Sequence, residues 1–351
     1  MKILYICEFS QGSTAPMRMS ALERAGHEVV RIDAKPFWPK NSLLFKIVFR
    51  ILVGPHIRRL NQEILRVARE VKPDCFWADK VMALQPSTLK KLSAMGITTV
   101  SYMIDNPFGP RRDPGWRLYM KNIPYFHLHC TQRDVSIPEY KQRGAKDVLK
   151  IQTAFEQTMH FPPPAGWSDK DRDRDASFIG TPYDQRAAVL TDLYRAGLPL
   201  VISGPERAWK RELAPEVFEA VFRDGELSDD RYREGIWRSK INISFVTKSN
   251  QDEFTQKSFE IAGCGGFLLA ERSDGHMARF REDEEAVFFS DLNECIEKIK
   301  KYLPEVEARE RIAAAGRKRA IESGYDNDSQ MRKILERVAE IAPRVKGART
   351  K

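Results

Sequence analysis

Short apolar runs alternate with helix-length segments along the first part of the chain. The apolar run at 2–7 is followed by a polar loop, a helix-like segment at 17–25 that closes at Gly26, and a second apolar run at 27–33. Glycine is common just after a helix because it readily adopts the left-handed backbone found there. This strand–loop–helix–strand order predicts the opening of a doubly wound parallel sheet. The same pattern predicts helices at 61–71 and 86–95 and strands at 74–77, 97–104 and 126–130.

A proline-rich and charge-rich stretch then interrupts the alternation. It holds three consecutive prolines at 162–164 and a run of mixed charges at 169–175. This composition is typical of a connection between domains, so we predict a linker at 156–175. The run contains Asp-x-Asp spacings, which could suggest a metal site, but the interleaved Arg172 and Arg174 favour a solvated linker.

The alternation resumes after the linker and gives way to helices near the end of the chain. It predicts strands at 176–179, 199–203, 241–246 and 267–270 and helices at 184–196, 292–302, 305–323 and 329–341. We therefore predict a Rossmann-like domain at 1–155, a second one at 176–325, and a helical segment at 326–351 that could pack back on the first domain. Ligands of such sheets bind at the carboxyl ends of the parallel strands, so we expect the chemistry there.

Composition narrows the class of protein. The 351 residues are 42% hydrophobic and 30% charged, which is a globular profile with room for two cores. No apolar run approaches the roughly 20 residues that span a bilayer, and the first apolar run is too short for a secretory signal. The five scattered cysteines lack metal-site spacing and predict a reducing, cytoplasmic location. The net charge of +9 favours anionic partners, but no compact basic run points to nucleic acid.

The segment 255–270 (TQKSFEIAGCGGFLLA) carries the most specific chemistry. Thr255 is a candidate N-cap, and the helix after it would point free backbone N–H groups and a positive dipole end at an anion such as a diphosphate. Lys257 would add a point charge, and Glu260 could accept hydrogen bonds from ribose hydroxyls. Glycine-rich turns between helix and strand also occur without any nucleotide, so both interpretations stay open on this pattern alone.

Several phrases of the C-terminal half resemble the CgeB-like branch of the group 1 glycosyltransferases. The phrases are SFIGT at 177–181 followed by Arg186, LVISG at 200–204, INISF at 241–245, T-x-K-x-F-E-x-A-G-C-G at 255–265, and EARERIAAAGRK at 307–318. The family usually has arginine where this chain has Lys257. The N-terminal half is similar more loosely, at KPD (72–74) and YMIDN (102–106).

The resemblance implies an α/β protein of the GT-B fold, with two Rossmann-like doubly wound domains facing across a cleft and C-terminal helices. It implies a glycosyltransferase that moves a sugar from a nucleotide diphosphate sugar to a saccharide, lipid-linked or protein acceptor, without a metal or other cofactor. Related enzymes with paired acidic residues generally retain the anomeric configuration. Two alternatives stay open: a nucleotide-sugar epimerase on the same scaffold, and a non-catalytic sugar-binding or coat-assembly protein.

The resemblance also implies roles for individual residues. It implies catalytic roles for Asp105, Asp252 and Lys257. Asp252 and Glu260 have the eight-residue separation of the acidic pair that flanks the donor, and Glu253 competes for the earlier role. Donor contacts are implied for Gly12, Ser13, Asn106, Gly180, Arg186, Gly204, Thr255, Lys257 and Glu260. The loop at Gly12 could equally be a plain turn, and Arg186 could pair with an acidic neighbour on its own helix.

Residues 43–59 (LLFKIVFRILVGPHIRR) combine dense apolar residues with basic ones. Lys46 and Arg50 lie one helical turn apart, and Arg58 and Arg59 follow. Such a helix could lie on an anionic membrane and bring the enzyme to a lipid-linked acceptor. The alternative is a helix of the N-terminal domain that packs against the sheet with its basic residues in water. We therefore expect a cytoplasmic protein with possible membrane association.

Overall fold

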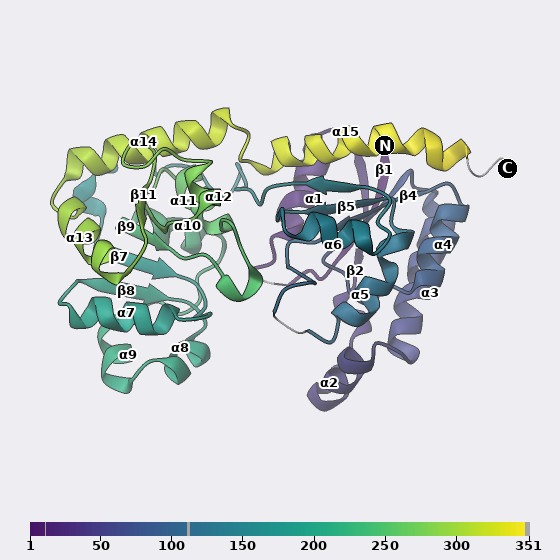
Figure 1. The fold of residues 1–351 in the computed structure, drawn as a ribbon, viewed down its shortest axis with the longest axis horizontal. Coiled ribbons are helices and arrows are strands. Elements are labelled where there is room, and N and C mark those ends of the chain that lie inside the picture. The colour runs from purple at the N-terminus through teal and green to yellow at the C-terminus, as the bar shows by residue number, and fades with distance from the viewer. Residues whose placement is uncertain (11, 111–112, 348–351) are drawn as a thin grey trace. The chain divides into compact units, whose positions relative to one another are not determined.

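The chain forms two compact α/β units. The structure is a computed structural model that describes residues 1–10, 12–110 and 113–347. The first unit consists of Met1–Gln152 and Asn327–Lys351, and the second is the continuous stretch Thr153–Asp326. In Figure 1 the purple-to-blue chain and the yellow C-terminal helix make up the first unit.

The first unit is built on a parallel sheet with the strand order β2-β1-β3-β4-β5-β6. Its inner strands are buried on both faces, which explains why they read as continuous apolar runs rather than as alternating ones. The strands are β1 (Lys2–Cys7), β2 (Glu28–Asp33), β3 (Cys75–Asp79), β4 (Thr98–Tyr102), β5 (Leu128–Thr131) and β6 (Val148–Lys150).

Helices cover both faces of this sheet. The helices of this unit are α1 (Ala15–Arg24), α2 (Ser42–Ile51), α3 (Pro55–Val71), α4 (Pro86–Ala94), α5 (Trp116–Asn122), α6 (Ser136–Gln142) and α15 (Asn327–Gly347), with short 3-10 turns η1 (Lys35–Phe37) and η2 (Ile123–Tyr125). Helix α15 places Met331, Ile334, Leu335 and Val338 in the same core as α1 and the sheet. Their spacing of three and four residues forms one helical face, so the end of the chain completes the first unit.

The second unit contains a five-stranded parallel sheet with the order β11-β10-β9-β7-β8. Its strands are β7 (Arg174–Ile179), β8 (Leu200–Ser203), β9 (Ser239–Ser244), β10 (Leu268–Glu271) and β11 (Val287–Phe289). Its helices are α7 (Arg186–Arg195), α8 (Glu206–Glu212), α9 (Pro215–Val221), α10 (Asp229–Trp237), α11 (Gln256–Gly263), α12 (Asp274–Met277), α13 (Leu292–Tyr302) and α14 (Val306–Glu322), with 3-10 turns η3 (Asp169–Asp171) and η4 (Lys248–Asn250).

Residues 156–175 are folded into the second unit, where the sequence predicted a solvated linker. The side chains of Glu156, His160 and Arg174 are buried, and Asp169 accepts a hydrogen bond from the buried Arg309 of α14. Charged residues next to prolines look solvated in sequence, but here their charges are paired within the unit. The chain passes between the units near residues 152 and 326 instead.

Helix α2 and helix α3 are separated by a sharp break. Leu52 ends α2 in the left-handed backbone region with φ 51°, and Gly54 follows with φ 103°. Within α2 only Val48 is buried, and it joins Leu52 and Ile57 in the core of the first unit. Part of 43–59 therefore packs as the alternative predicted, while most of α2 stays exposed. Helix α3, in contrast, packs through Ile57, Leu60, Ile64 and Leu65. Within the described residues, no helix is both long enough and apolar enough to cross a membrane.

Candidate functional site

Two glycines let the backbones of neighbouring strand ends approach closely at the carboxyl edge of the second sheet. Gly180 follows β7 and Gly204 follows β8, and the Trp209 indole N–H donates to the Gly180 carbonyl oxygen over 2.8 Å. A Cβ on Gly204 would lie 2.0 Å from that same oxygen. No side chain fits there, so the sequence must keep glycine at 204 for the two strand ends to approach. The resemblance to a family implied donor contacts at both glycines, and the structure places both at this edge.

Arg186 begins α7 at the same edge, and its guanidinium is buried. It donates to the carbonyl oxygens of Thr181 (3.2 Å) and Phe245 (3.3 Å) and to the Thr247 hydroxyl (2.9 Å). Its Nε has no hydrogen-bond partner among the described residues. Burial lowers the pKa of this guanidinium, although arginine keeps its proton in proteins. Arg186 therefore remains a cation held by neutral oxygens, and it does not pair with an acidic neighbour on its own helix.

A second cation, the half-buried Lys257, lies in the first turn of α11. Its Nζ is 3.1 Å from the Tyr232 hydroxyl and 4.7 Å from the centre of the Tyr232 ring. Its Cε would be 3.6 Å from a Cβ placed on Gly180, so it reaches the same edge of the sheet. The pKa of Lys257 is lowered to about 8, mainly by burial; Glu260 opposes this shift and nearby Arg186 adds to it. In the described part of the chain Lys257, like Arg186, forms no ion pair.

Glu260 is buried one turn further along α11 and already accepts hydrogen bonds. The Tyr232 hydroxyl donates to one carboxylate oxygen over 2.6 Å, and the Gln256 amide donates to the other over 2.9 Å. Burial would raise the pKa of this carboxyl, but His160, Lys257 and the two hydrogen bonds hold it below its usual value. A carboxylate has about four lone-pair sites, so Glu260 can accept further hydrogen bonds from a ligand.

His160 and Tyr232 complete this cluster, and sequence reasoning missed both. The His160 Nε2 lies 4.0 Å from the Glu260 carboxylate, and burial lowers the pKa of its imidazole. His160 therefore holds its proton, and attracts Glu260 most strongly, only at acid pH. His160 falls in the predicted linker, and Tyr232 lies on a helix that the sequence did not predict. Neither residue lies near Glu260 in the sequence or belongs to a motif with it, so no local signal in the sequence indicates the contact.

The residues before α11 form a tight loop. Thr255 occupies the predicted N-cap position with extended backbone, but its side chain makes no capping hydrogen bond. The Asp252 N–H donates to the Thr247 carbonyl over 3.1 Å, and its carboxylate accepts from the Asn250 amide over 3.1 Å. Glu253 uses its carbonyl oxygen to accept from the Ser273 hydroxyl. Of the two acidic residues, Asp252 has its carboxylate within the electrostatic reach of Arg186.

The remaining predicted residues belong to the first unit. Asp105 forms an ion pair with Lys80 at 2.6 Å, and Asn106 is buried, where its side-chain oxygen accepts from the Phe108 N–H over 3.0 Å. Both follow β4 at the carboxyl edge of the first sheet. Gly12 has φ +74° in the loop after β1, and the Ser13 N–H donates to the Ser10 carbonyl. The structure thus gathers the predicted residues at the carboxyl edges of two separate sheets.

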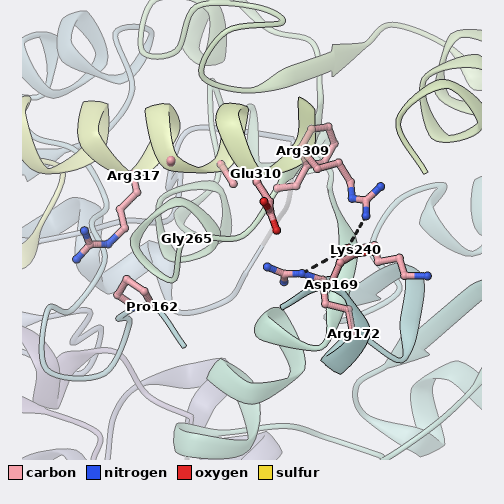
Figure 2. Close-up of a pocket in the computed structure, with 11 residues that line it drawn as sticks. Pro162, Asp169, Arg172, Lys240, Gly265, Arg309, Glu310 and Arg317 are labelled. Carbon is pink, nitrogen blue, oxygen red and sulfur yellow. Dashed lines mark hydrogen bonds and ion pairs between the residues drawn. The ribbon is translucent and has the colours of Figure 1, made fainter. Parts of the chain in front are cut away.

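A cavity of about 310 Å³ lies at the other end of the second sheet (Figure 2). Lys240 at the start of β9 and Gly265 before β10 line it together with α14. The lining of this cavity is rich in arginine, but two of these arginines, Arg309 and Arg172, face the carboxylate of Asp169. Asp169 thus partly offsets these two charges, and the cavity is away from the carboxyl edge that carries Arg186. Within the described ranges, no three His, Cys, Asp or Glu side chains gather to hold a metal ion.

Comparison with known proteins identifies the architecture. Residues 186–336 match the family described as glycosyl transferase-like. HepE of Anabaena, solved in complex with UDP, is 14% identical, with 97% of this chain and 100% of that chain covered at a TM-score of 0.68. Sucrose-phosphate synthase of Thermosynechococcus elongatus is 11% identical, with 97% and 99% covered and a TM-score of 0.67. A UDP-forming α,α-trehalose-phosphate synthase of Burkholderia xenovorans is 13% identical, with 97% and 99% covered and a TM-score of 0.60.

No curated protein sequence matches the chain. At these identities the structural similarity shows the fold, and it confirms the predicted GT-B architecture of two parallel-sheet α/β domains. The matched family region covers α7, α11 and α14, so it includes Arg186, Lys257 and Glu260. The fold and the family match over residues 186–336 together support a glycosyltransferase.

Proposed function

We propose that this GT-B glycosyltransferase takes its sugar from a nucleotide diphosphate sugar held at the carboxyl edge of the second sheet. One observation carries the proposal: Arg186 and Lys257 are largely buried cations at that edge, and neither has a carboxylate partner among the described residues. A buried charge without a directly paired counter-charge is costly, and a bound diphosphate would supply that direct partner. The N-terminus of α11 adds a positive dipole end beside Lys257.

The same groups would serve the chemical step. Negative charge grows on the diphosphate as the bond from the sugar to its leaving oxygen breaks. Donors already fixed in place stabilise that charge without reorganisation, so Arg186 and Lys257 would lower the barrier without a metal ion. We accordingly propose that neither a metal nor another cofactor is required. Asp252, in the loop before α11, is our candidate for the acidic residue beside the sugar.

The donor's ribose would hydrogen-bond to Glu260, whose carboxylate is ionised and has acceptor sites to spare. UDP is the first nucleotide to test, because structural neighbours include one solved with UDP and one described as UDP-forming. We propose that the first unit supplies Asp105, Asn106, Gly12 and Ser13 to the sugar or acceptor. The motif at 255–265 supports the CgeB-like branch, and the acidic pair supports retention of configuration.

A thermal-shift screen in the presence of EDTA tests the donor and the absence of a metal requirement together. Among UDP, GDP, TDP and CDP, at least one should raise the unfolding midpoint, since a ligand at 100 times its Kd adds about 2.7 kcal/mol to the folded state. Arg186→Ala with Lys257→Ala should abolish that shift. If none of the four shifts the parent, the donor site is misplaced. A shift that appears only after magnesium or manganese is added would rule out the metal-free proposal.

The affinity for UDP should fall as pH rises through about 8, because Lys257 loses its proton there in the free protein. A bound diphosphate raises the pKa of Lys257, so binding takes up a proton above that pH and affinity drops by up to about tenfold per pH unit. The terminal phosphate of UDP loses its last proton near pH 6, so its own ionisation does not contribute to the slope around pH 8. Calorimetry across the range checks the slope. Lys257→Arg keeps its charge and should give a flat profile; an equal slope in both proteins would exclude Lys257 as the cause.

A further inference from the structure

Helix α2 presents an apolar face to solvent. Leu43, Leu44, Ile47 and Ile51 are 67%, 43%, 48% and 53% exposed, and they share one side of the helix at spacings of one, four and eight residues. Val53, in the turn that follows, is 57% exposed. Single exposed apolar residues are normal on proteins, but a contiguous set on one helical face marks an interaction surface. We call these five residues the α2 face.

The orientation of this face is fixed by packing on the other side of the helix. Val48 and Leu52 are buried in the core of the first unit. The Phe45 and Phe49 rings stack at 5.6 Å between centroids, and the Trp38 indole packs edge-on against both, at 5.5 and 5.9 Å. Helix α2 is therefore anchored by one side while the α2 face points outward. In Figure 1 the helix projects from the body of its own unit.

Along the chain, the charged residues within and on either side of α2 all have one sign. Lys46 and Arg50 are exposed, lie one turn apart, and flank the apolar side of the helix. Between Asp33 and Glu63 the sequence contains six basic residues and no acidic one: Lys35, Lys40, Lys46, Arg50, Arg58 and Arg59. An apolar strip bordered by lysine and arginine is the pattern of a helix that lies in the interface of a membrane with anionic lipids.

We propose that α2 binds the surface of an anionic lipid bilayer, with the α2 face inserted at the boundary between the headgroups and the acyl chains and Lys46 and Arg50 at the phosphates. The ten residues of α2 span about 15 Å, half of the hydrocarbon thickness, so the helix lies in the plane of the membrane rather than across it. The exposed Lys46 and Arg50 favour this occupant over a second copy of the chain, because a symmetric contact through α2 would bring the identical basic residues together. This surface belongs to the first unit and does not depend on the proposed donor site.

Vesicle flotation of the full chain tests the proposal. The protein should float with vesicles that contain phosphatidylserine and much less with pure phosphatidylcholine, and added salt should weaken the binding. Lys46→Glu with Arg50→Glu should reduce partitioning by roughly 30-fold or more, from about 1 kcal/mol per basic residue. Leu43→Ser with Ile47→Ser should also reduce it, and these exposed changes should leave the unfolding midpoint unchanged.

The matched control is Lys90→Glu with Lys91→Glu on α4, an exposed pair in the same unit that changes the net charge by the same amount. It should float nearly as well as the parent. Three results would overturn the proposal: equal flotation with neutral and anionic vesicles, equal losses in the α2 and α4 charge variants, or full binding by the serine variant. Analytical ultracentrifugation tests the competing occupant, a second copy of the chain, by measuring the oligomeric state. A parent dimer that Leu43→Ser with Ile47→Ser converts to monomer would show that a second copy covers the α2 face.

Discussion

Glu260→Gln should weaken UDP binding by roughly 10- to 150-fold, which corresponds to about 1.5–3 kcal/mol for charge-assisted hydrogen bonds. A carboxylate that accepts from ribose hydroxyls does so before and during the reaction, so the loss should appear mainly in affinity. Glutamine would also place an amide N–H₂ where Glu260 now accepts from Tyr232 or Gln256. Lys257→Ala should behave differently, because Lys257 faces charge that grows during the reaction. It should lower kcat as well as affinity.

Calorimetry with UDP, beside steady-state kinetics once an acceptor is known, separates the two roles. Lys257→Arg should be tolerated, since arginine is the usual residue at that position in the family that the motif resembles. Glu297→Gln on α13 makes the same chemical change at an exposed position and should have no effect. Circular dichroism confirms that each variant folds. If Glu260→Gln and Lys257→Ala both bind UDP as tightly as the parent, the donor does not occupy the edge that these residues line.

Asp79→Ala should lower the free energy of unfolding by about 3–5 kcal/mol. Asp79 and Arg18 form a buried, two-pronged ion pair in the first unit, with N–O distances of 2.7 and 3.0 Å, and the Tyr5 hydroxyl donates to the same carboxylate. The exposed fractions of the Arg18 and Asp79 side chains are 4% and 0%, so alanine would leave the guanidinium buried without a counter-charge. The size of the effect reflects that stranded charge rather than the net strength of the pair.

Urea unfolding followed by circular dichroism measures the loss. The exposed pair between Arg66 and Glu63 provides the control, because Glu63→Ala should cost no more than about 1 kcal/mol. The two units can unfold in separate transitions. The lower free energy of unfolding should then appear in the transition of the first unit, which contains Asp79. UDP binding, which we place in the second unit, should survive below that transition. A loss for Asp79→Ala as small as that for Glu63→Ala would mean that water reaches Arg18 once the carboxylate is removed.

The sequence predicted the parallel strands best where burial makes them apolar throughout. It missed β6 and β11, which are three residues long and lie at the edges of their sheets, where a short strand leaves little pattern to read. The candidate site divides in the same way. Lys257 and Glu260 lie within one continuous motif and could be predicted from it. Their partners His160 and Tyr232 are 100 and 28 positions from Glu260 in the chain, and only the tertiary fold brings them to it.

The linker prediction shows how composition can mislead. Prolines and mixed charges indicate a solvated connection when each residue is taken alone. Here the half-buried Asp169 pairs with Arg309, and the buried Arg174 pairs with Asp224, so partners from distant parts of the second unit offset the cost of removing these charges from water. Complementary charges that are remote in sequence leave no local signal.

The placement of α15 has a consequence for biosynthesis. The second unit is one unbroken stretch of chain, and its two ends are joined where the Phe155 N–H donates to the Tyr325 carbonyl over 3.0 Å. The first unit lacks part of its core until α15 is made, because Met331, Ile334, Leu335 and Val338 come from the end of the chain. On the ribosome the unit that starts first therefore finishes last. Premature termination before residue 327 would release a complete second unit attached to a first unit whose apolar sheet face is uncovered, a natural target for chaperones and proteases.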